Sequence, residues 1–212
     1  NINEIKSRFE NNSVLMGNSR VTYGGGLVSS DEKVRKDTVS FVKQMGGLSV
    51  KLGCPSTYLR PGSMNENGAW LPHSENHTEK VFDRLIDSTR QICNVAESEG
   101  MILILEGGYV SPVYSAKRVK DFFEGVGSKN LKFNQDPVNF LSSLEQAYNT
   151  KEFLEEFFTL LGEYTISADL KDFKVVDSLM FQLEEDIWFW LLLILLGMLL
   201  VFLWTQLWKK RT

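Results

Sequence analysis

The sequence predicts an α/β fold built on a parallel sheet, either a closed barrel or a doubly wound sheet. From residue 30 to 172, apolar runs of strand length alternate with the spacing of three and four that is typical of amphipathic helices. Three acids, Glu106, Asp136 and Asp169, lie at or near the ends of such runs and are separated by 30 and 33 residues. This separation is about the length of one βα unit, so each acid occupies the same place in its unit.

The first helix is predicted after the Tyr-Gly-Gly-Gly turn at residues 23–26. Its apolar face consists of Val34, Thr38, Phe41, Val42 and Met45. Ser29 and Glu32 have the spacing of a capping box, which places the start of the helix there. A strand is expected next at residues 49–54, followed by a long loop rich in Pro, Gly and Asn that runs to Pro72.

The second helix is predicted to end at Gly100, where a glycine can adopt the left-handed conformation of a helix C-terminus. Its apolar positions are Val81, Leu85, Ile92, Cys93 and Ala96. The run MILILE at residues 101–106 then predicts a strand that is buried on both faces and ends in a carboxylate.

The same pattern of helix and strand occurs twice more. A helix that ends at Gly127 precedes a strand at residues 131–136, and a helix that ends at Gly162 precedes a strand at residues 164–172. The apolar faces are Val119, Phe122, Phe123 and Val126 in the first helix, and Phe153, Leu154, Phe157 and Leu161 in the second. The repetition supports a parallel sheet, because parallel strands need crossover connections.

Charged residues at the carboxyl ends of buried parallel strands are costly unless they are paired or bind a cation. We therefore predict that Glu106, Asp136 and Asp169 converge as oxygen ligands for Mg²⁺ or Mn²⁺, with Zn²⁺ as an alternative. The competing interpretation is that these acids are solvated in βα loops. A single acid favours that interpretation, whereas three acids in phase favour the metal site.

Other polar residues are candidates for substrate contacts. His73 precedes the second helix, and we expect it to contact substrate rather than a metal, because Asn76 and Glu79 resemble a helix cap. Arg60 follows the first predicted strand and could bind an anionic substrate or form a structural salt bridge. Lys171 admits the same two interpretations.

Composition excludes several classes of protein. Cys54 and Cys93 are too few for a disulfide scaffold and lack metal-site spacing, so we expect core thiols. Without the terminal Lys-Lys-Arg, 20 basic residues face 27 acidic ones, a net charge of −7, which disfavours a nucleic-acid surface.

The C-terminal part of the sequence has the properties of a membrane anchor. Residues 187–208 carry no charge over 22 positions, roughly 33 Å of helix, which matches a bilayer core. Trp188, Trp190, Trp204 and Trp208 lie near the two ends of this run, as in an interfacial aromatic belt. We expect a single-pass membrane protein whose anchor lies in the lipid bilayer. The basic residues after the span predict a cytosolic C-terminus, whereas tail-anchored insertion gives the opposite orientation.

Five segments, in order and at βα spacing, resemble the sugar phosphate isomerase/epimerase family of xylose-isomerase-like TIM barrels. They are LGCPSTYLRPGS, WLPHSENHTEKVFDRLIDSTRQIC, AESEGMILILEGG, VGSKNLKFNQDPVNF and SADLKDF. The resemblance covers roughly residues 20 to 185 and implies a TIM barrel. It also implies a divalent metal held by a Glu after the fourth strand, an Asp after the fifth, a His after the sixth and a Glu after the eighth.

The resemblance assigns roles to residues of this chain. It places Glu106 and Asp136 in the first two metal positions, and it places Asn139 where many members carry a substrate-contacting His. Asp169 stands at the His of an H-x-K-D motif whose Lys171 and Asp172 are retained. An Asp can still ligate a hard cation, so the resemblance still implies a metal site.

The resemblance departs from the family at both ends of the chain. The first strand is not evident before Asn1, and after FQLEE, which resembles the seventh strand, the eighth strand and its metal-binding Glu have no counterpart. We thus expect a partial barrel domain at residues 1–185, a transmembrane helix at 186–208 and a basic tail at 209–212. The two open barrel edges are expected to be covered by a partner chain, as in a homo-oligomer, or by swapping, or to stay uncovered.

The resemblance implies a metal-dependent isomerase or epimerase that moves a proton next to the carbonyl of a sugar or sugar phosphate, with Glu106 as the base. The alternative is a catalytically inactive, membrane-tethered barrel that acts as a binding or scaffolding module. Endonuclease IV has the same kind of fold, but its three-zinc cluster requires several His ligands and this chain has two.

Overall fold

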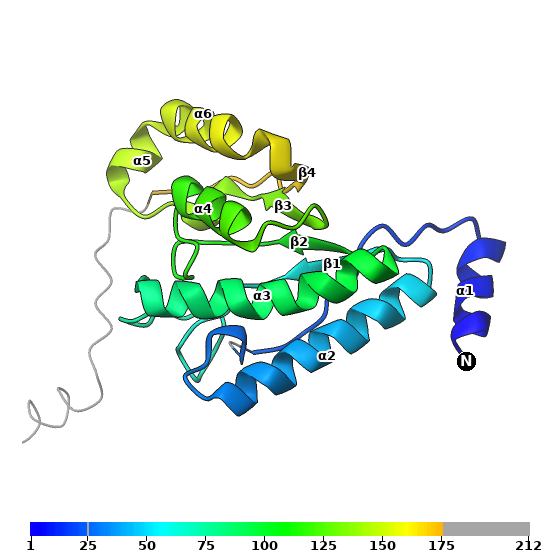
Figure 1. The fold of residues 1–212 in the computed structure, drawn as a ribbon. Helices are drawn as coiled ribbons and strands as arrows, with labels where there is room; N and C mark the ends of the chain where they lie inside the picture. Colours follow the sequence, from blue (N-terminus) through cyan, green and yellow to red (C-terminus); the bar gives the residue numbers. More distant parts are fainter. Residues whose placement is uncertain (25, 176–212) are drawn as a thin grey trace, which may run out of the picture. The chain divides into compact units, whose positions relative to one another are not determined.

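The computed structural model describes residues 1–24 and 26–175, and this part of the chain forms a parallel α/β fold (Figure 1). Its sheet has four strands in chain order, β1 (Ser56–Leu59), β2 (Ile102–Leu105), β3 (Leu131–Gln135) and β4 (Thr165–Ala168). Each strand pairs in parallel with the strand that precedes it in the sequence. The predicted α/β class and the parallel sheet are therefore confirmed.

Helices connect the strands. They are α1 (Ile2–Asn11), α2 (Glu32–Lys51), α3 (Glu79–Glu99), α4 (Ala116–Val126), α5 (Leu144–Tyr148) and α6 (Thr150–Leu161), with 3₁₀ turns at Gly26–Val28, Pro137–Phe140 and Gly162–Tyr164. Helix α3 lies between α2 and α4 and contacts both, and α4 also contacts α6 (Figure 1). Helices α2, α3, α4 and α6 thus form one continuous layer on the sheet.

The hydrophobic core lies between the sheet and these helices. Alternate residues of a strand point to opposite faces. One face of the sheet carries the fully buried side chains of Leu59, Leu103, Leu105 and Phe133, which belong to the same core cluster as Phe122 and Phe157 from the helices. The other face carries polar side chains, including Asn134 and Ser167. The polar face of the sheet is therefore the one on which a binding or catalytic site is expected.

The strand predicted at residues 49–54 is wrong. Helix α2 continues through Lys51, and Leu52 still donates its N–H to the carbonyl of Leu48 at 3.0 Å. Gly53 then adopts φ +90°, which ends the helix, and the strand begins at Ser56. Short apolar runs fit the end of a buried helix as well as a strand, which explains the error.

The predicted helix starts and ends are partly confirmed. Gly100 and Gly127 follow α3 and α4 with φ of 68° and 72°, as expected for left-handed C-terminal residues. Gly162 is right-handed helical and leads into a 3₁₀ turn. The N-cap of α2 is Asp31 rather than Ser29, because the Asp31 carboxylate accepts the N–H of Lys33 at 2.7 Å.

A segment before β1 adds a further parallel pairing that the sequence did not predict. Ser19 donates its N–H to the carbonyl of Ser56 at 2.9 Å and accepts the N–H of Tyr58 at 3.0 Å. The backbone next to Ser19 therefore lies along the edge of β1, which places Arg20 beside the carboxyl end of the sheet.

Within residues 1–24 and 26–175, the structure contains no helix that is long and apolar enough to cross a membrane. The predicted span at residues 187–208, the FQLEE segment and the basic tail lie outside the described residues.

Candidate metal centre

A charged residue directly follows each of the four strands. Arg60 follows β1, Glu106 follows β2, Asp136 follows β3 and Asp169 follows β4. The carboxyl ends of parallel strands meet at one edge of a sheet, so these residues form a row in strand order. The three acids were predicted to converge, and the structure brings them together.

Carboxylate oxygens of Glu106, Asp136 and Asp169 lie within 4.8 Å of one another. Glu106 is 7% exposed, Asp136 is 1% exposed and Asp169 is half-buried. Burial of three carboxylates this close together is unfavourable unless cations compensate their charge. Ligands of one hard cation meet this condition, because oxygens bound at 2.0–2.6 Å from an ion also lie within a few ångströms of each other.

One carboxylate oxygen of Asp136 accepts hydrogen bonds and the other accepts none from the described residues. Its Oδ2 accepts hydrogen bonds from the Lys171 ammonium and from the Asn139 amide, the latter at 2.7 Å. Its Oδ1 is buried and makes no hydrogen bond to the described residues. A buried lone pair without a donor is costly, and a bound cation would satisfy it. The residues present thus fit a divalent metal.

Electrostatics couple Asp136 to Lys171. Burial raises the pKa of Asp136 above its ordinary value, and the hydrogen bond and charge of Lys171 oppose that rise. The same hydrogen bond raises the pKa of Lys171. Lys171 thus favours the ionised form of Asp136, which is the form that binds a metal. The Lys171 ammonium also donates to the side-chain Oδ1 of Asn139 at 3.3 Å, so two of the four residues predicted to contact substrate lie at this centre.

Glu106 is paired with arginine. Its Oε2 accepts a hydrogen bond from Nε of Arg60 at 3.1 Å, and Nη2 of Arg20 lies 3.9 Å from the same oxygen. The salt bridge that was one of two interpretations of Arg60 is therefore present. Since Arg60 binds Oε2, Oε1 is left for a metal ion or a proton.

Asp169 is held by groups on the polar face of the sheet. The side-chain amide of Asn134 donates to Asp169 Oδ2 at 3.2 Å, and the Ser167 hydroxyl donates to the side-chain Oδ1 of Asn134 at 2.6 Å. The backbone N–H of Asp169 donates to the carbonyl of Gln135 at 3.0 Å. These bonds orient the third carboxylate toward the other two.

Sequence analysis missed Arg20, Tyr58 and Asn134. Burial raises the pKa of Tyr58, and the charges of Asp169 and Glu106 raise it further. Asn134 could have been found, because it precedes Asp136 by two residues and so faces the same side of the strand. Arg20 could not, because no apolar run marks the pairing of its segment with β1.

The predicted helix cap at Asn76 is wrong, and the two histidines lie outside the acidic group. The residue before α3 is Thr78, whereas Asn76 is buried. The Asn76 side chain accepts the N–H of Met64 at 2.8 Å and donates to Ser63 at 2.9 Å, so it ties the long loop together. His73 is exposed, with Nδ1 accepting the N–H of Glu75 at 3.2 Å, and its substrate contact stays a prediction.

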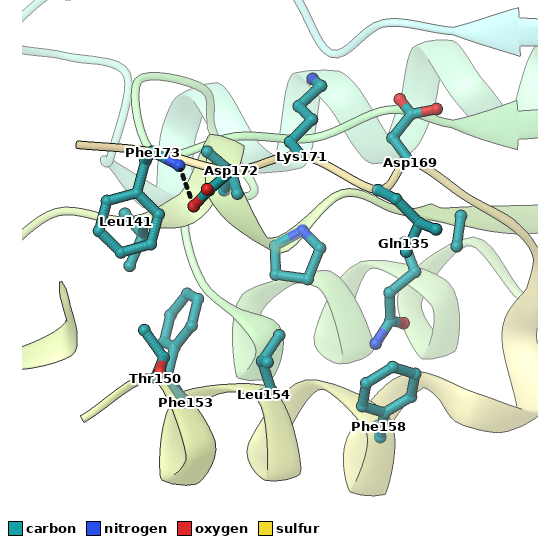
Figure 2. A pocket seen from close by; sticks show the side chains of 14 residues that line it. Gln135, Leu141, Thr150, Phe153, Leu154, Phe158, Asp169, Lys171, Asp172 and Phe173 are labelled. Atoms are coloured by element: carbon teal, nitrogen blue, oxygen red, sulfur yellow. Dashed lines mark hydrogen bonds between the residues drawn. The ribbon is translucent and has the colours of Figure 1, made fainter. Parts of the chain in front are cut away.

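A groove of about 290 Å³ lies beside the acids, between α6 and residues 168–173. Figure 2 shows Phe153, Leu154 and Phe158 reaching into it from α6, while Asp169 and Lys171 point away from α6. Residues Asp169 and Lys171 line the groove, so it adjoins the acidic group, although their side chains point away from α6. The two cysteines, expected as core thiols, are buried and free.

Comparison with solved structures finds the same fold in sugar epimerases. A xylose isomerase domain protein from Planctomyces limnophilus is 20% identical with a TM-score of 0.57, over 79% of this chain and 56% of that one. D-psicose 3-epimerase from Clostridium cellulolyticum H10, solved with D-tagatose, is 19% identical with a TM-score of 0.56, over 76% and 55%. The 3-keto-D-glucoside 4-epimerase of E. coli is 16% identical with a TM-score of 0.58, over 76% and 62%.

The chain thus spans between a half and two thirds of the length of these structures. At these identities the likeness establishes the fold, and the four described strands form part of a barrel. No curated protein matches the sequence significantly. The sequence does match the family described as xylose isomerase-like TIM barrel, over residues 1–184. This chain therefore belongs to the xylose isomerase-like TIM barrel family.

Proposed function

We propose that this protein is a metal-dependent isomerase or epimerase that moves a proton next to the carbonyl of a sugar or sugar phosphate. The observation that carries the proposal is the convergence of Glu106, Asp136 and Asp169 within 4.8 Å at the carboxyl edge of the sheet. Structures of the same fold include D-psicose 3-epimerase and 3-keto-D-glucoside 4-epimerase, which supports the reaction class.

Glu106, Asp136 and Asp169 would hold the metal. All three offer carboxylate oxygens, which favours Mn²⁺ or Mg²⁺ over Zn²⁺. A bound divalent ion would supply Lewis acidity to the carbonyl and the adjacent hydroxyl of the substrate. The unpartnered Oδ1 of Asp136 is the atom in the group that most needs such an ion.

Glu106 is the proposed base. Arg60 holds Oε2 at 3.1 Å and so fixes the orientation of the carboxylate, which can take the proton from the carbon next to the carbonyl. Lys171 and Asn139 lie beside Asp136, where they can donate to substrate oxygens. A second acid must return the proton at the adjacent carbon or on the opposite face.

Metal binding tests the ligand assignment. We expect isothermal titration of the purified protein with Mn²⁺ to show one site, and the variant Glu106→Gln to bind at least about tenfold more weakly, because a neutral amide replaces a charged ligand. The control is Glu155→Gln, an exposed acid on α6 whose loss leaves the affinity unchanged. Equal Mn²⁺ affinity of Glu106→Gln and the wild type rejects the ligand assignment.

Turnover tests the reaction. The wild type is assayed with a panel of ketoses and ketose phosphates in deuterated water, so that epimerisation or isomerisation incorporates deuterium next to the carbonyl. We expect incorporation that a chelator abolishes and that Glu106→Gln lacks. A protein that binds Mn²⁺ but exchanges no proton with any member of the panel contradicts the reaction, though not the metal site.

We also propose, from the sequence, that residues 187–208 anchor the protein in a membrane. The full chain is then expected to stay with the membrane fraction during alkaline carbonate extraction. Protease treatment of sealed vesicles shows on which side residues 1–185 lie. Release of the full chain into the carbonate supernatant contradicts the anchor.

A further inference from the structure

Two arginines lie beside the acidic group, and we propose that Arg20 and Arg60 form a subsite for an anionic group of the substrate, either a phosphate or a carboxylate. The proposal rests on the proposed function of the neighbouring acids and narrows its substrate class. The substrate would be a carbohydrate that carries a negative charge close to its reacting carbons, rather than a neutral sugar.

Arg60 has its side chain fixed but part of its hydrogen-bonding capacity free. Its Nε donates to Glu106, and its guanidinium lies over the Trp70 ring at 5.8 Å from the centroid. Its two terminal nitrogens make no hydrogen bond to any described residue, and the side chain is 19% exposed. A guanidinium has five N–H donors in a rigid fork that matches phosphate and carboxylate. Arg60 can therefore bind an anion while it keeps its bond to Glu106.

Trp70 is itself held in place by the chain that follows β2. A side-chain carbon added at Gly108 would lie 3.0 Å from the indole of Trp70 and 3.0 Å from the carbonyl oxygen of Asn139. The indole thus packs closely on the backbone of this glycine, where a side-chain carbon would crowd it. The stacked ring favours the charged guanidinium and limits its orientations. This packing preorganises Arg60.

Arg20 supplies the second positive charge from a different segment. Because Ser19 is bonded to β1, Arg20 stands next to Tyr58, with its guanidinium 5.5 Å from the centroid of that ring. Its Nη2 lies 3.9 Å from Oε2 of Glu106, beyond hydrogen-bond distance, and its side chain is 56% exposed. Arg20 can therefore bind a ligand without first breaking a hydrogen bond to Glu106.

The charges at the edge of the sheet explain why a second arginine is present. Glu106, Asp136 and Asp169 contribute three negative charges, and Arg20, Arg60 and Lys171 contribute three positive ones. The site is therefore balanced without a metal, and a divalent ion would leave it with a net charge of +2. An excess of positive charge in a partly buried site attracts an anion. A phosphate dianion restores the balance, whereas a neutral ketose does not.

Phosphate binding tests this subsite. The probe is inorganic phosphate, titrated into the protein loaded with Mg²⁺ and followed by ³¹P NMR, and Mn²⁺ in place of Mg²⁺ reports proximity through faster ³¹P relaxation. We expect Arg60→Gln and Arg20→Gln each to weaken phosphate binding about tenfold, because each removes a charge-assisted contact. Arg60→Lys keeps the charge but loses the fork, so it is expected to fall between the wild type and Arg60→Gln.

The control variant is Arg8→Gln, which removes one guanidinium from an exposed ion pair on α1 and is expected to bind phosphate like the wild type. Competition with a ketose phosphate and with a hexuronate distinguishes the two sources of the anion. Arg60→Gln could fail to fold, because Glu106 loses its partner. The test of the subsite is then the phosphate affinity of Arg20→Gln, which is expected to fold because the Arg20 side chain is mostly exposed.

Two results would overturn the subsite. One is equal phosphate affinity in Arg20→Gln, Arg60→Gln and Arg8→Gln, which would mean a binding site elsewhere. The other is the absence of phosphate binding with and without Mg²⁺. Failure of the proposed function looks different, because a protein that binds Mg²⁺ and phosphate, with weaker phosphate binding in Arg20→Gln, but exchanges no proton with any sugar keeps the subsite and loses only the reaction.

Discussion

At the scale of single residues, the metal centre depends on which carboxylate oxygens are already bonded. Asp136 offers an unbonded Oδ1 while Lys171 and Asn139 hold its Oδ2. Burial and Lys171 act on this carboxyl group in opposite directions, so its ionisation depends on one ammonium group. The pH dependence of metal binding should therefore change when Lys171 is replaced.

We predict that Lys171→Gln makes Mn²⁺ affinity more sensitive to acid. Without the ammonium, the pKa of Asp136 rises further, so protons compete with the metal from a higher pH downward. The ratio of variant to wild-type affinity is expected to fall by at least about threefold between pH 8 and pH 5. Titration calorimetry at both pH values measures the ratio, with Lys151→Gln as an exposed control. A constant ratio would show that Lys171 does not act on Asp136.

Cys93 gives a second prediction that depends on pH. Burial raises the pKa of this thiol to about 11, whereas an unfolded thiol ionises near about pH 8.5. Between these values the folded protein binds more protons than the unfolded chain, so the free energy of unfolding falls as pH rises. The contribution is at most about 1.4 kcal/mol per pH unit. Urea denaturation at pH 8 and pH 10 should show that the free energy of unfolding falls less in Cys93→Ala than in the wild type. An equal fall in both proteins would contradict the assignment.

The site residues that directly follow strands could be predicted from the sequence. The residues whose position depends on how distant segments pair could not. Glu106, Asp136 and Asp169 could be predicted because parallel strands end at one edge, whatever the details of their pairing. Arg20 depends on the bond between Ser19 and Ser56, which no local pattern indicates. Asn76 was misassigned because the same spacing describes a helix cap and a buried amide whose partners are distant in sequence.

At the scale of elements, helix α6 has one buried and one open face. Phe157 is 1% exposed and packs 4.9 Å from Phe140 between ring centroids, whereas its neighbour Phe158 is 58% exposed and lines the apolar groove (Figure 2). Adjacent phenylalanines on one helix thus have different surroundings, and they form a matched pair for mutation.

We predict that Phe157→Ala lowers the free energy of unfolding by about 3–5 kcal/mol, because it removes a buried aromatic ring and leaves a cavity. Phe158→Ala is expected to change it by less than about 1 kcal/mol, because its ring is mostly exposed. Urea denaturation followed by circular dichroism measures both. Similar losses in the two variants would mean that Phe158 is covered in the native protein.

Element order could be predicted better than element boundaries. Three of the four strands lie within the predicted ranges, because each follows a glycine near the end of a helix and precedes an acid. Strand β1 was misplaced because the end of α2 carries apolar residues that resemble a strand. The N-cap of α2 shifted by two residues because serine and aspartate both cap helices well.

At the scale of the whole molecule, the fold class and the family agree. The alternation of strands and helices left a barrel and a doubly wound sheet open, and the match over residues 1–184 decides for the barrel family. Sequence periodicity alone could not decide, because both architectures are built from the same βα unit. The distinction depends on sheet closure, which involves pairings between segments distant in sequence.

The order of the strands has a consequence for synthesis. Strands β2, β3 and β4 each pair with the strand translated just before them. Each new strand can therefore pair with one that has already left the ribosome. Within residues 56–168, the sheet can therefore form strand by strand from the N-terminal side, because no strand depends on a distant later segment for its first partner. Nascent chains arrested after β3 should already protect the amides of β2 from deuterium, whereas the amides of β3 that point toward β4 become protected only after β4 has emerged.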